Sequence, residues 1–370
     1  MSDWHESSLG EQINLKRGYD LPGKDRLDGS IPIFSSSGIS GYHREKMSGG
    51  PGVITGRYGT IGQVFYSPSA YWPLNTTLYV QDFKGNNPKF VYYFLQQLDW
   101  GKYSDKSAVP GVNRNDVHQE KVSFPVHDEQ KAIAAVLSSL DDKIDLLHRQ
   151  NITLEAMAET LFRRWFVEEA QEDWEKVTLE DVTSRITDGA HTSPPTVEVG
   201  FPMASVKDMY QWGINTESCR QISKNDFDEL VRTDCRPLKN DILIAKDGSY
   251  LKHVFVAEGD MDVVILSSIA ILRPNGKYHP LLLATFLKLD STRESLENIV
   301  TGAVIPRIVL KDFRKYKLLL PPKQLQDQAL FFIQPLYEKC WENDRQIKTL
   351  EKLRDTLLPK LMSGEVRVAY

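Results

Sequence analysis

The sequence repeats one of its segments far along the chain, and this duplication limits the possible folds more than any other feature. The matched residues lie 196 positions apart (306 − 110) and pair Pro110 with Pro306, Asp116 with Asp312, Lys121 with Lys317 and Pro125 with Pro321. The string RQNITLE at 149–155 returns at the same distance as RQIKTLE at 345–351. This separation exceeds the period of solenoid repeats. It indicates that a domain-sized module occurs twice.

Each copy continues into a segment with the pattern of a long helix. Apolar or seam residues alternate in steps of four and three, the heptad spacing of helices that pack side by side. The seams comprise Ile133, Leu137, Leu140, Ile144, Leu147, Asn151, Leu154, Ala158, Leu161 and Trp165, and then Ala329, Ile333, Leu336, Cys340, Asn343, Ile347, Leu350, Arg354, Leu357 and Leu361. The first helix is predicted over about 129–167, with Asp128 as its N-cap. In the second we expect a kink at Pro335, a last turn disturbed by Pro359, and an end at Gly364.

A single helix cannot bury such a seam, and the simplest partner for each long helix is the other one. Two copies related by a pseudo-twofold axis would pack antiparallel, with the remaining segments at opposite ends. Asn151 and Asn343 both fall on the seam, where polar residues fix register at a cost in stability. We expect them in neighbouring layers near the midpoint of the pair. The alternative is that both helices are core elements of one globular fold.

The segments outside the helices are each large enough to form a domain. Both open alike, at Trp4 to Leu9 and at Trp174 to Leu179, and both contain β-like runs, a glycine loop and a helical patch. The fold class is α/β (α+β type), with an antiparallel coiled coil between two domains. Similarity fades inside the domains, which favours two bodies that bind different things. The predicted organisation is 1–127 first domain, 128–170 first long helix, 171–321 second domain and 322–364 second long helix.

The composition is that of a globular protein, with 41% hydrophobic and 26% charged residues. No apolar run is long enough to cross a membrane, and the N-terminus shows no secretory pattern, so we expect a cytoplasmic protein. The three cysteines fit no zinc spacing and are expected to be reduced. The net charge of −5 comes mostly from 128–173 and leaves both domains near neutral. Any basic face on a domain must therefore be local.

Two matched loops are the strongest candidates for contacts with DNA. VITGRYGTIG (53–62) and LIAKDGSYLK (243–252) each combine glycine, a cation and an aromatic residue after a β-like run. Such a tip brings backbone, charge and a flat ring close to a ligand. The alternative is a hairpin turn with incidental charge. The predicted contact residues are Arg57, Tyr58, Thr60, Lys246, Asp247, Ser249, Tyr250 and Lys252.

Further candidates lie in the loop ITDGAHTSPP (186–195) and in the segments before the repeated strand. The loop offers His191 and Thr192 as donors to base edges or phosphate, although a lone histidine is more often structural. The second group offers phosphate contacts from Lys102, Lys106, Asn113, Arg114, Arg307 and Lys311. Alternatively these segments are buried loops that support the helix starts, the role we assign to Pro110, Pro306, Asp116 and Asp312.

The sequence shows no catalytic constellation. It lacks the NPPY or DPPY motif that places a base for methyl transfer, a Walker motif for ATP, and an acid–lysine cluster typical of nucleases. It also lacks a metal-binding histidine or cysteine pattern. We therefore expect a binding subunit and not an enzyme, with no catalytic residues, metal or cofactor of its own.

The ordered set of strings resembles the specificity subunit of type I restriction–modification systems over essentially the whole chain. The strings are TDGAHTSPP, TGAVIP, FPVHDEQKAIAAVLSSLDDKIDLL and LEAMAETLFRRWF, with two variable domains alternating with two repeated helices. LPPKQLQDQ in place of the usual LPPLxEQ and Pro335 are departures. The resemblance implies that each target-recognition domain reads one half of a bipartite double-stranded DNA sequence. It also implies that the helices fix the gap between the halves.

The resemblance further implies partner subunits. Two methyltransferase (modification) subunits would dock on the helices and use S-adenosylmethionine, and restriction (helicase-nuclease) subunits would add cleavage with ATP and Mg²⁺. The docking face is expected to consist of exposed apolar residues outside the seam, namely Val136, Met157, Phe162, Phe166, Leu353 and Leu358. Near-neutral domains predict weak binding of DNA by the chain alone. The alternatives are a coiled-coil scaffold, a stand-alone DNA-binding protein, the specificity subunit of a fused restriction enzyme, and an enzyme with a cryptic site.

Overall fold

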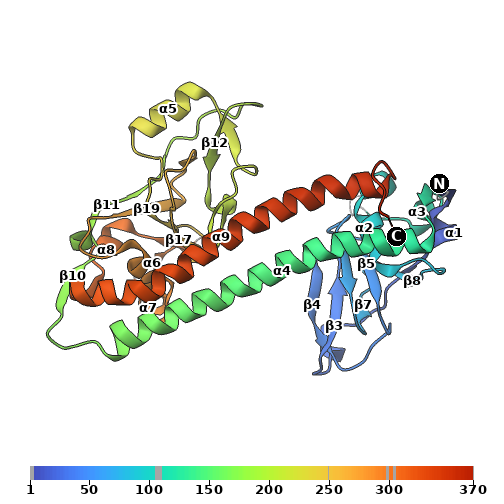
Figure 1. Cartoon of the computed structure of the whole chain (residues 1–370), viewed down its shortest axis with the longest axis horizontal. Coiled ribbons are helices and arrows are strands. Elements are labelled where there is room, and N and C mark those ends of the chain that lie inside the picture. The colour runs from blue at the N-terminus through green and yellow to red at the C-terminus, as the bar shows by residue number, and fades with distance from the viewer. Residues whose placement is uncertain (1–3, 105–110, 249, 297–299, 303–305, 370) are drawn as a thin grey trace. The chain divides into compact units, whose positions relative to one another are not determined.

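The computed structural model describes residues 4–104, 111–248, 250–296, 300–302 and 306–369. The chain forms two compact units, one made of Met1–Asp145 with Lys348–Tyr370 and the other of Leu146–Ile347. Each unit contains one domain and parts of both long helices, which are green (α4, His127–Arg163) and red (α9, Lys323–Met362) in Figure 1. The boundary between the units therefore falls within each long helix.

The first unit is built on a four-stranded antiparallel sheet and a smaller three-stranded sheet. The larger sheet has the order β2-β8-β5-β6 and the smaller the order β4-β3-β7, while β1 pairs with β9. The strands are β1 His5–Ser8, β2 Asn14–Arg17, β3 Ile31–Ser35, β4 Gly38–His43, β5 Gly52–Gly56, β6 Val64–Ser67, β7 Trp72–Pro73, β8 Thr77–Asp82 and β9 Lys121–Phe124. The short helices are α1 Leu9–Gln12, α2 Pro88–Gln96 and α3 Arg114–His118.

The second unit repeats this arrangement with different strands. Its larger sheet has the order β11-β19-β16-β17, its three-stranded sheet the order β15-β12-β18, and β10 pairs with β22. These strands are β10 Glu175–Thr178, β11 Thr183–Asp188, β12 Phe201–Ala204, β15 Arg220–Ile222, β16 Ile242–Ala245, β17 Val254–Val256, β18 Val264–Ile265, β19 Ile269–Pro274 and β22 Lys317–Leu320. Two ribbons are added, β13 Met209–Tyr210 with β14 Gly213–Ile214 and β20 Val300–Thr301 with β21 Arg307–Ile308. The helices are α5 Lys224–Arg232, α6 Pro280–Lys288, α7 Asp290–Leu296 and α8 Leu310–Arg314.

The shared strand order shows that the duplication extends through the domains, where the sequences have diverged. In both units the larger sheet places its strands in the same chain order, and α2 or α6 follows the central strand. The predicted mixed α/β fold is confirmed.

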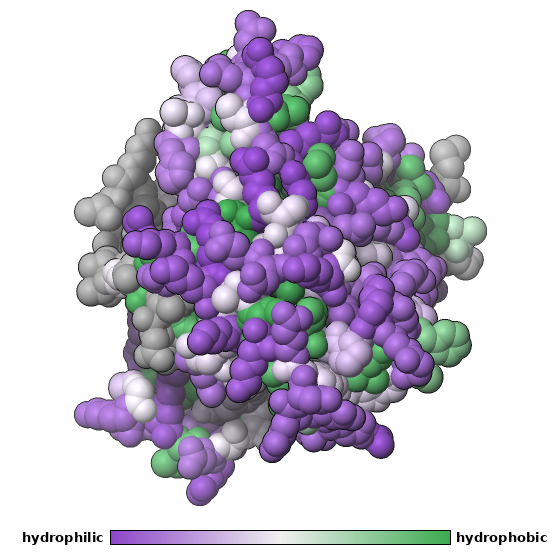
Figure 2. All heavy atoms as spheres, turned by 90° about the vertical axis from the view of Figure 1, so that its left-hand side faces the viewer, coloured by the Kyte–Doolittle hydropathy of each residue, from purple (hydrophilic) through white to green (hydrophobic). Residues whose placement is uncertain are grey.

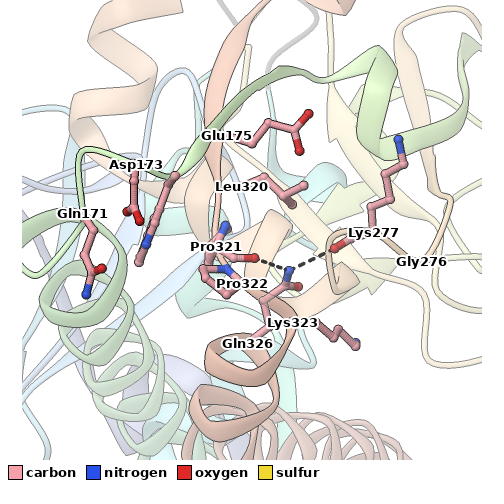
Figure 3. Close-up of a pocket in the computed structure, with 11 residues that line it drawn as sticks. Gln171, Asp173, Glu175, Gly276, Lys277, Leu320, Pro321, Pro322, Lys323 and Gln326 are labelled. Atoms are coloured by element: carbon pink, nitrogen blue, oxygen red, sulfur yellow. Dashed lines mark hydrogen bonds between the residues drawn. The ribbon is translucent and has the colours of Figure 1, made fainter.

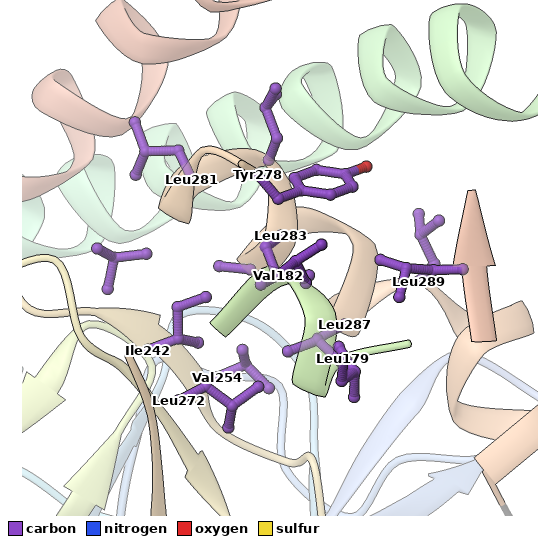
Figure 4. Packing of buried hydrophobic residues seen from close by; sticks show 14 of the residues in the cluster. Leu179, Val182, Ile242, Val254, Leu272, Tyr278, Leu281, Leu283, Leu287 and Leu289 are labelled. Atoms are coloured by element: carbon purple, nitrogen blue, oxygen red, sulfur yellow. The ribbon is translucent and has the colours of Figure 1, made fainter. Parts of the chain in front are cut away.

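The core of the second unit forms where α6 packs on the larger sheet. Pro280 occupies the first turn of α6, and the His279 side chain caps it by accepting a hydrogen bond from the Leu281 N–H at 3.3 Å. Leu283 and Leu287 of this helix belong to the same buried cluster as the sheet residues labelled in Figure 4, which are Ile242, Val254 and Leu272. Each such fully buried leucine contributes about 1.5–3 kcal/mol.

The long helices differ from the prediction at their ends. The helix α4 begins at His127, so Asp128 lies in the first turn, where a carboxylate interacts favourably with the helix dipole, and not at the N-cap. A π-helical turn at Arg164–Glu168 follows α4. The helix α9 continues through Pro335 and Pro359. Gly364 adopts φ +75° just beyond α9, as expected of a residue that ends a helix.

The heptad seam is confirmed in each unit. In the first unit Asp141 of α4 forms an ion pair of 3.1 Å with Arg354 of α9. In the second unit Asn151 lies against Asn343, and the rings of Trp165 and Phe332 are 5.8 Å apart. In the second unit the residue numbers of these contacts rise along α4 as they fall along α9, so the two helices pack antiparallel there. Every predicted seam residue is buried or half-buried.

A repeated glutamine fastens each long helix to its domain. Gln130 accepts the Asn87 N–H at 2.9 Å and donates to the Pro125 carbonyl at 3.0 Å. Gln326 in the other repeat accepts the His279 N–H at 3.0 Å and donates to Pro321 and Lys277 (both 2.9 Å, Figure 3). Both glutamines are almost fully buried, which explains why this position is identical in the two repeats.

The three cysteines are buried and form no disulfide. Among the described residues no helix is long and apolar enough to span a membrane.

Candidate nucleic-acid interface

The first unit has a cationic cleft of about 390 Å³ around the predicted loop. It forms where the end of β2, the turn after β5 and the start of α3 meet. The cleft brings together four predicted residues from two parts of the chain, Arg57 with Tyr58 and Asn113 with Arg114. Its remaining lining residues are Arg17, Leu78, Gly111, Val112 and Asn115.

The backbone holds Arg57 and Tyr58 rigidly at the edge of this cleft. The Arg57 N–H donates to Thr76 at 2.8 Å, and the Arg57 carbonyl accepts the Val112 N–H at 3.0 Å. Tyr58 forms an isolated antiparallel bridge with Gly111. A Cβ atom on Gly111 would lie 2.2 Å from the Tyr58 ring, so only glycine fits there. The guanidinium of Arg57 lies over the Tyr58 ring, with its Cζ 4.5 Å from the ring centre.

The other predicted residues of the first unit have varied surroundings. Thr60 and Arg114 are exposed, and the exposed Asn113 caps α3 by accepting the Asn115 N–H at 3.0 Å. Lys102 donates to Glu120 at 2.8 Å, so its charge is already partly matched. Lys106 lies outside the described residues.

The equivalent loop of the second unit has the same backbone arrangement. Asp247 forms an antiparallel bridge with Arg307, and the Lys246 carbonyl accepts the Ile308 N–H at 3.0 Å. Gly248 adopts φ +76°, as Gly59 adopts +77° in the first unit. The internal repeat therefore extends to the loop tips, although their side chains differ.

The ammonium group of Lys246 forms an ion pair within the protein. Its Nζ lies 2.6 Å from Asp188 Oδ2, and only 9% of its side chain is exposed. The ammonium group is therefore engaged by a carboxylate and shielded from solvent, in contrast to the guanidinium of Arg57. Sequence pattern alone did not reveal this pair, because Asp188 lies far away in the chain, at the end of β11.

Asp188 also reaches His191, which lies beside a second cleft. The His191 Nε2 is 3.2 Å from Asp188 Oδ1, and 76% of the histidine side chain is exposed. The cleft measures about 650 Å³ and is also lined by Thr192, Asp226 and Glu229. Its acidic lining suits donor groups of a ligand better than phosphate oxygens.

The remaining predicted residues of the second unit surround the same loop. Lys252 and Arg307 are exposed, and Tyr250 is half-buried against the domain core. Lys311 is exposed in the first turns of α8. Ser249 lies outside the described residues.

Three of the six residues expected on an exposed docking face are buried, and this expectation was wrong for them. Phe162 is 1% exposed and packs on Phe166 (ring centres 4.9 Å apart), and Phe166 packs on Trp174 at 6.3 Å. Leu358 is 6% exposed within the core of the first unit. Phe162 of α4 and Phe166 of the π-helical turn after it belong to the core of the second unit, and Leu358 of α9 belongs to the core of the first, which the seam pattern does not reveal.

Met157 and Leu353 remain exposed, at 49% and 45%. They are matched by the repeat (157 + 196 = 353). Val136 is half-buried against the core of the first unit. Hydrophilic side chains cover most of the face drawn in Figure 2, with apolar ones scattered among them. Phe331 and Phe332 of α9 are also exposed, and the heptad pattern gave no signal for this pair.

A third cleft, of about 550 Å³, lies in the second unit where β10 and the start of α9 meet (Figure 3). It is lined by acidic Asp173 and Glu175 and by basic Lys277 and Lys323. This mixture of charges shows no preference for an anionic ligand.

Comparisons with known proteins agree with this architecture. The Type I restriction modification DNA specificity domain matches residues 1–156 and again 171–352. The MjaIX specificity subunit of a type I restriction enzyme from Methanocaldococcus jannaschii is 27% identical, over 99% of this chain and 94% of that protein. The HindI specificity subunit from Haemophilus influenzae is 19% identical, over 75% of this chain and 77% of that protein.

A solved structure shares the fold. The S subunit of a type I restriction–modification system from M. genitalium superposes with a TM-score of 0.62 at 20% identity, covering 98% of this chain and 96% of that one. Both units of the present chain thus have counterparts in a protein of similar length. The two domain matches cover the whole chain except residues 157–170 and 353–370. The chain therefore belongs to the type I restriction–modification DNA specificity family.

Proposed function

We propose that this chain selects the DNA target of a type I restriction–modification complex, each domain reading one half of a bipartite sequence. The observation behind the proposal is that the two domains share their backbone arrangement but carry different side chains on their matched loops. Both units share the strand order and the bridge that fixes the loop, yet one tip presents Arg57 on Tyr58 and the other buries Lys246 against Asp188. Similar scaffolds with different side chains suit two different half-sites.

The long helices are proposed to set the gap between the half-sites. They are the parts of the repeat that stay alike in sequence, and they pack by a regular heptad seam in each unit. A continuous helix adds a fixed length of about 1.5 Å per residue. A change in helix length should therefore change the gap.

Two methyltransferase subunits are proposed to dock at equivalent places on the helices. Met157 and Leu353 are the exposed apolar residues that the repeat places at the same position in each copy. Two identical partners need two equivalent surfaces, and the repeat supplies them. Restriction subunits would join the same complex, and the chain itself is proposed to be non-catalytic. S-adenosylmethionine, ATP and Mg²⁺ then belong to the partners.

Selection from random DNA tests the proposed function. The chain is co-expressed and co-purified with the methyltransferase subunits proposed as its partners, and bound duplexes are sequenced. We expect one motif with two specific blocks and a gap of constant length. Duplexes without a common motif would favour the scaffold alternative. A motif bound equally well without methyltransferase would favour a stand-alone DNA-binding protein.

Matched variants test the docking sites. Met157→Arg with Leu353→Arg should weaken methyltransferase binding at least about tenfold, because each arginine places a charge where the proposed interface would bury an apolar side chain. Ala156→Lys is the control, since position 156 corresponds to Lys352 in the other repeat (156 + 196 = 352) and both are exposed. Its binding should match the wild type. Equal binding by the double arginine variant would rule out these sites.

A further inference from the structure

The stacked pair of Arg57 and Tyr58 is pre-organised without a carboxylate partner, whereas Lys102 and Lys246 are held by carboxylates. The guanidinium lies over the ring at 4.5 Å, and the Arg57 backbone is hydrogen-bonded on both sides. No ion pair joins Arg57 to a carboxylate among the described residues. Stacking on a ring restricts the plane of the guanidinium but leaves its edge free to donate. A side chain held in this way loses little rotamer freedom when it binds.

An arginine edge of this kind fits one base better than the others. Guanine presents two neighbouring acceptors, O6 and N7, in the major groove, and a guanidinium can donate to both at once. Adenine offers one acceptor beside a donor, and thymine one acceptor beside a methyl group. A fixed arginine plane therefore discriminates in favour of guanine.

Two neighbouring arginines can contact phosphates, so Arg57 is not needed for that role and is available to contact a base. Arg17 and Arg114 line the same cleft and are both exposed, and neither is stacked on a ring. Flexible exposed arginines suit phosphate oxygens, which position the protein without reading sequence. Arg17 lies 4.0 Å from Asp20, a loose contact between two exposed side chains.

Among the described residues, the matched loop of the second unit has no arginine stacked on a ring. Lys246 occupies the matched position, but its ammonium lies 2.6 Å from Asp188 and is 9% exposed. The exposed polar side chains around this loop belong to Lys252 and Arg307, and the exposed His191 contacts Asp188. The two tips thus differ in chemistry and not only in size.

We propose that Arg57 is a specificity-determining residue that donates two hydrogen bonds to O6 and N7 of one guanine in the half-site read by the first domain. This rests on the proposed function, since it assigns a base to one of the two half-sites.

The test measures coupling between the residue and a single atom of the base. The complex with methyltransferase subunits is titrated with its target duplex, in which each guanine is replaced in turn by 7-deazaguanine, which lacks the N7 acceptor. We expect one position in one half-site to weaken wild-type binding roughly 10-fold or more. With Arg57→Ala the same replacement should cost nothing further. Arg57→Lys should keep part of the affinity but lose most of the preference for guanine.

Matched variants separate base contacts from phosphate contacts and from unfolding. Arg17→Ala and Arg114→Ala should weaken every duplex alike and reduce the salt dependence, while leaving the 7-deazaguanine effect intact. Lys252→Ala, exposed beside the equivalent loop of the second unit, should also leave it intact. Thermal unfolding of Arg57→Ala should match the wild type.

Two results would overturn the inference. One is an Arg57→Ala variant that binds all duplexes more weakly while every 7-deazaguanine costs as much as before, which would make Arg57 a phosphate contact. The other is a target in which no guanine couples to Arg57. Both leave a specific complex in place, whereas a wild-type complex without sequence preference would instead defeat the proposed function.

Discussion

Asn151 and Asn343 form a direct hydrogen bond across the seam of the long helices, with Asn343 Nδ2 donating to Asn151 Oδ1 at 2.8 Å. Both side chains are buried, at 4% and 0% exposure. Asn151 also donates to the Cys340 carbonyl at 3.3 Å, whereas Asn343 Oδ1 accepts no hydrogen bond from the described residues. The prediction that these residues would be neighbours is confirmed. A buried polar pair of this kind fixes the register of a seam and costs stability.

This pair predicts opposite effects for single and double replacement. Asn343→Ala should destabilise the chain by about 1–3 kcal/mol, because it leaves Asn151 Oδ1 buried without its donor. Asn151→Leu with Asn343→Leu should recover the wild-type free energy of unfolding or exceed it. Denaturant unfolding of the wild type, Asn151→Leu, Asn343→Leu and the double leucine variant forms a double-mutant cycle that measures the coupling. Additive losses would show that the hydrogen bond carries no coupling.

Replacing one partner of the ion pair between Lys288 of α6 and Glu155 of α4 should strongly destabilise the second unit. Nζ lies 2.6 Å from Glu155 Oε1, the side chains are only 8% and 14% exposed, and the ammonium is 4.8 Å from the Trp212 ring centre. Lys288→Met should cost about 3–5 kcal/mol, because the Glu155 carboxylate then keeps the Gln211 amide as a hydrogen-bond donor but loses its cation.

An exposed pair serves as the control for this prediction. Lys224 and Asp228 of α5 are 67% and 49% exposed, so Lys224→Met should cost less than about 0.5 kcal/mol. Calorimetric unfolding compares the two variants directly. Equal losses would mean that burial does not set the strength of the Lys288 pair.

Stability is expected to fall in mild acid. Burial and nearby cations lower the pKa of His118 and of His279, and in each the neutral ring accepts a backbone N–H, from Leu15 and Leu281 respectively. Their folded pKa values lie below the unfolded value of about 6.5, so the unfolded chain takes up more protons as the pH falls below it. The stability they contribute is present above about pH 6.5 and is lost on acidification toward the folded pKa values.

Replacing both histidines measures this contribution. His118→Gln with His279→Gln should flatten the pH dependence of the free energy of unfolding between about pH 7 and pH 5. His148→Gln, on the exposed face of α4, should keep the wild-type slope. A double variant with an unchanged slope would show that other groups cause the acid sensitivity.

Much of the fold could be predicted because repetition and heptad spacing are properties of the sequence itself. The seam from Ile133 to Trp165 identified both the helix and its partner. The predicted exposure of the docking residues was only partly correct, since Phe162 and Phe166 pack under a domain whose shape the pattern does not contain. Arg17 was missed because β2 joins the cleft only after folding. Lys246 was predicted as a DNA contact, and its ion pair with Asp188 became visible only in three dimensions.

The proposed ruler role predicts a change of spacing. Seven residues inserted after Asp145 in α4 and after Ile347 in α9 preserve the heptad phase and add about 10 Å of helix. The gap in the DNA target should lengthen by about three base pairs, given about 3.4 Å per base pair. Seven glycine and serine residues inserted at Gly259, an exposed loop position, should leave the gap unchanged. A constant gap with the longer helices would refute the ruler role.

The central claim is that this chain selects a bipartite DNA target, and methylome sequencing of the source cell tests it most directly. We expect cells with the gene to carry methylation at a motif of two specific blocks, and cells without it to lose that motif alone. Restoring the gene with Arg57→Ala should relax the motif in one block only. An identical set of methylated motifs with and without the gene would contradict the account.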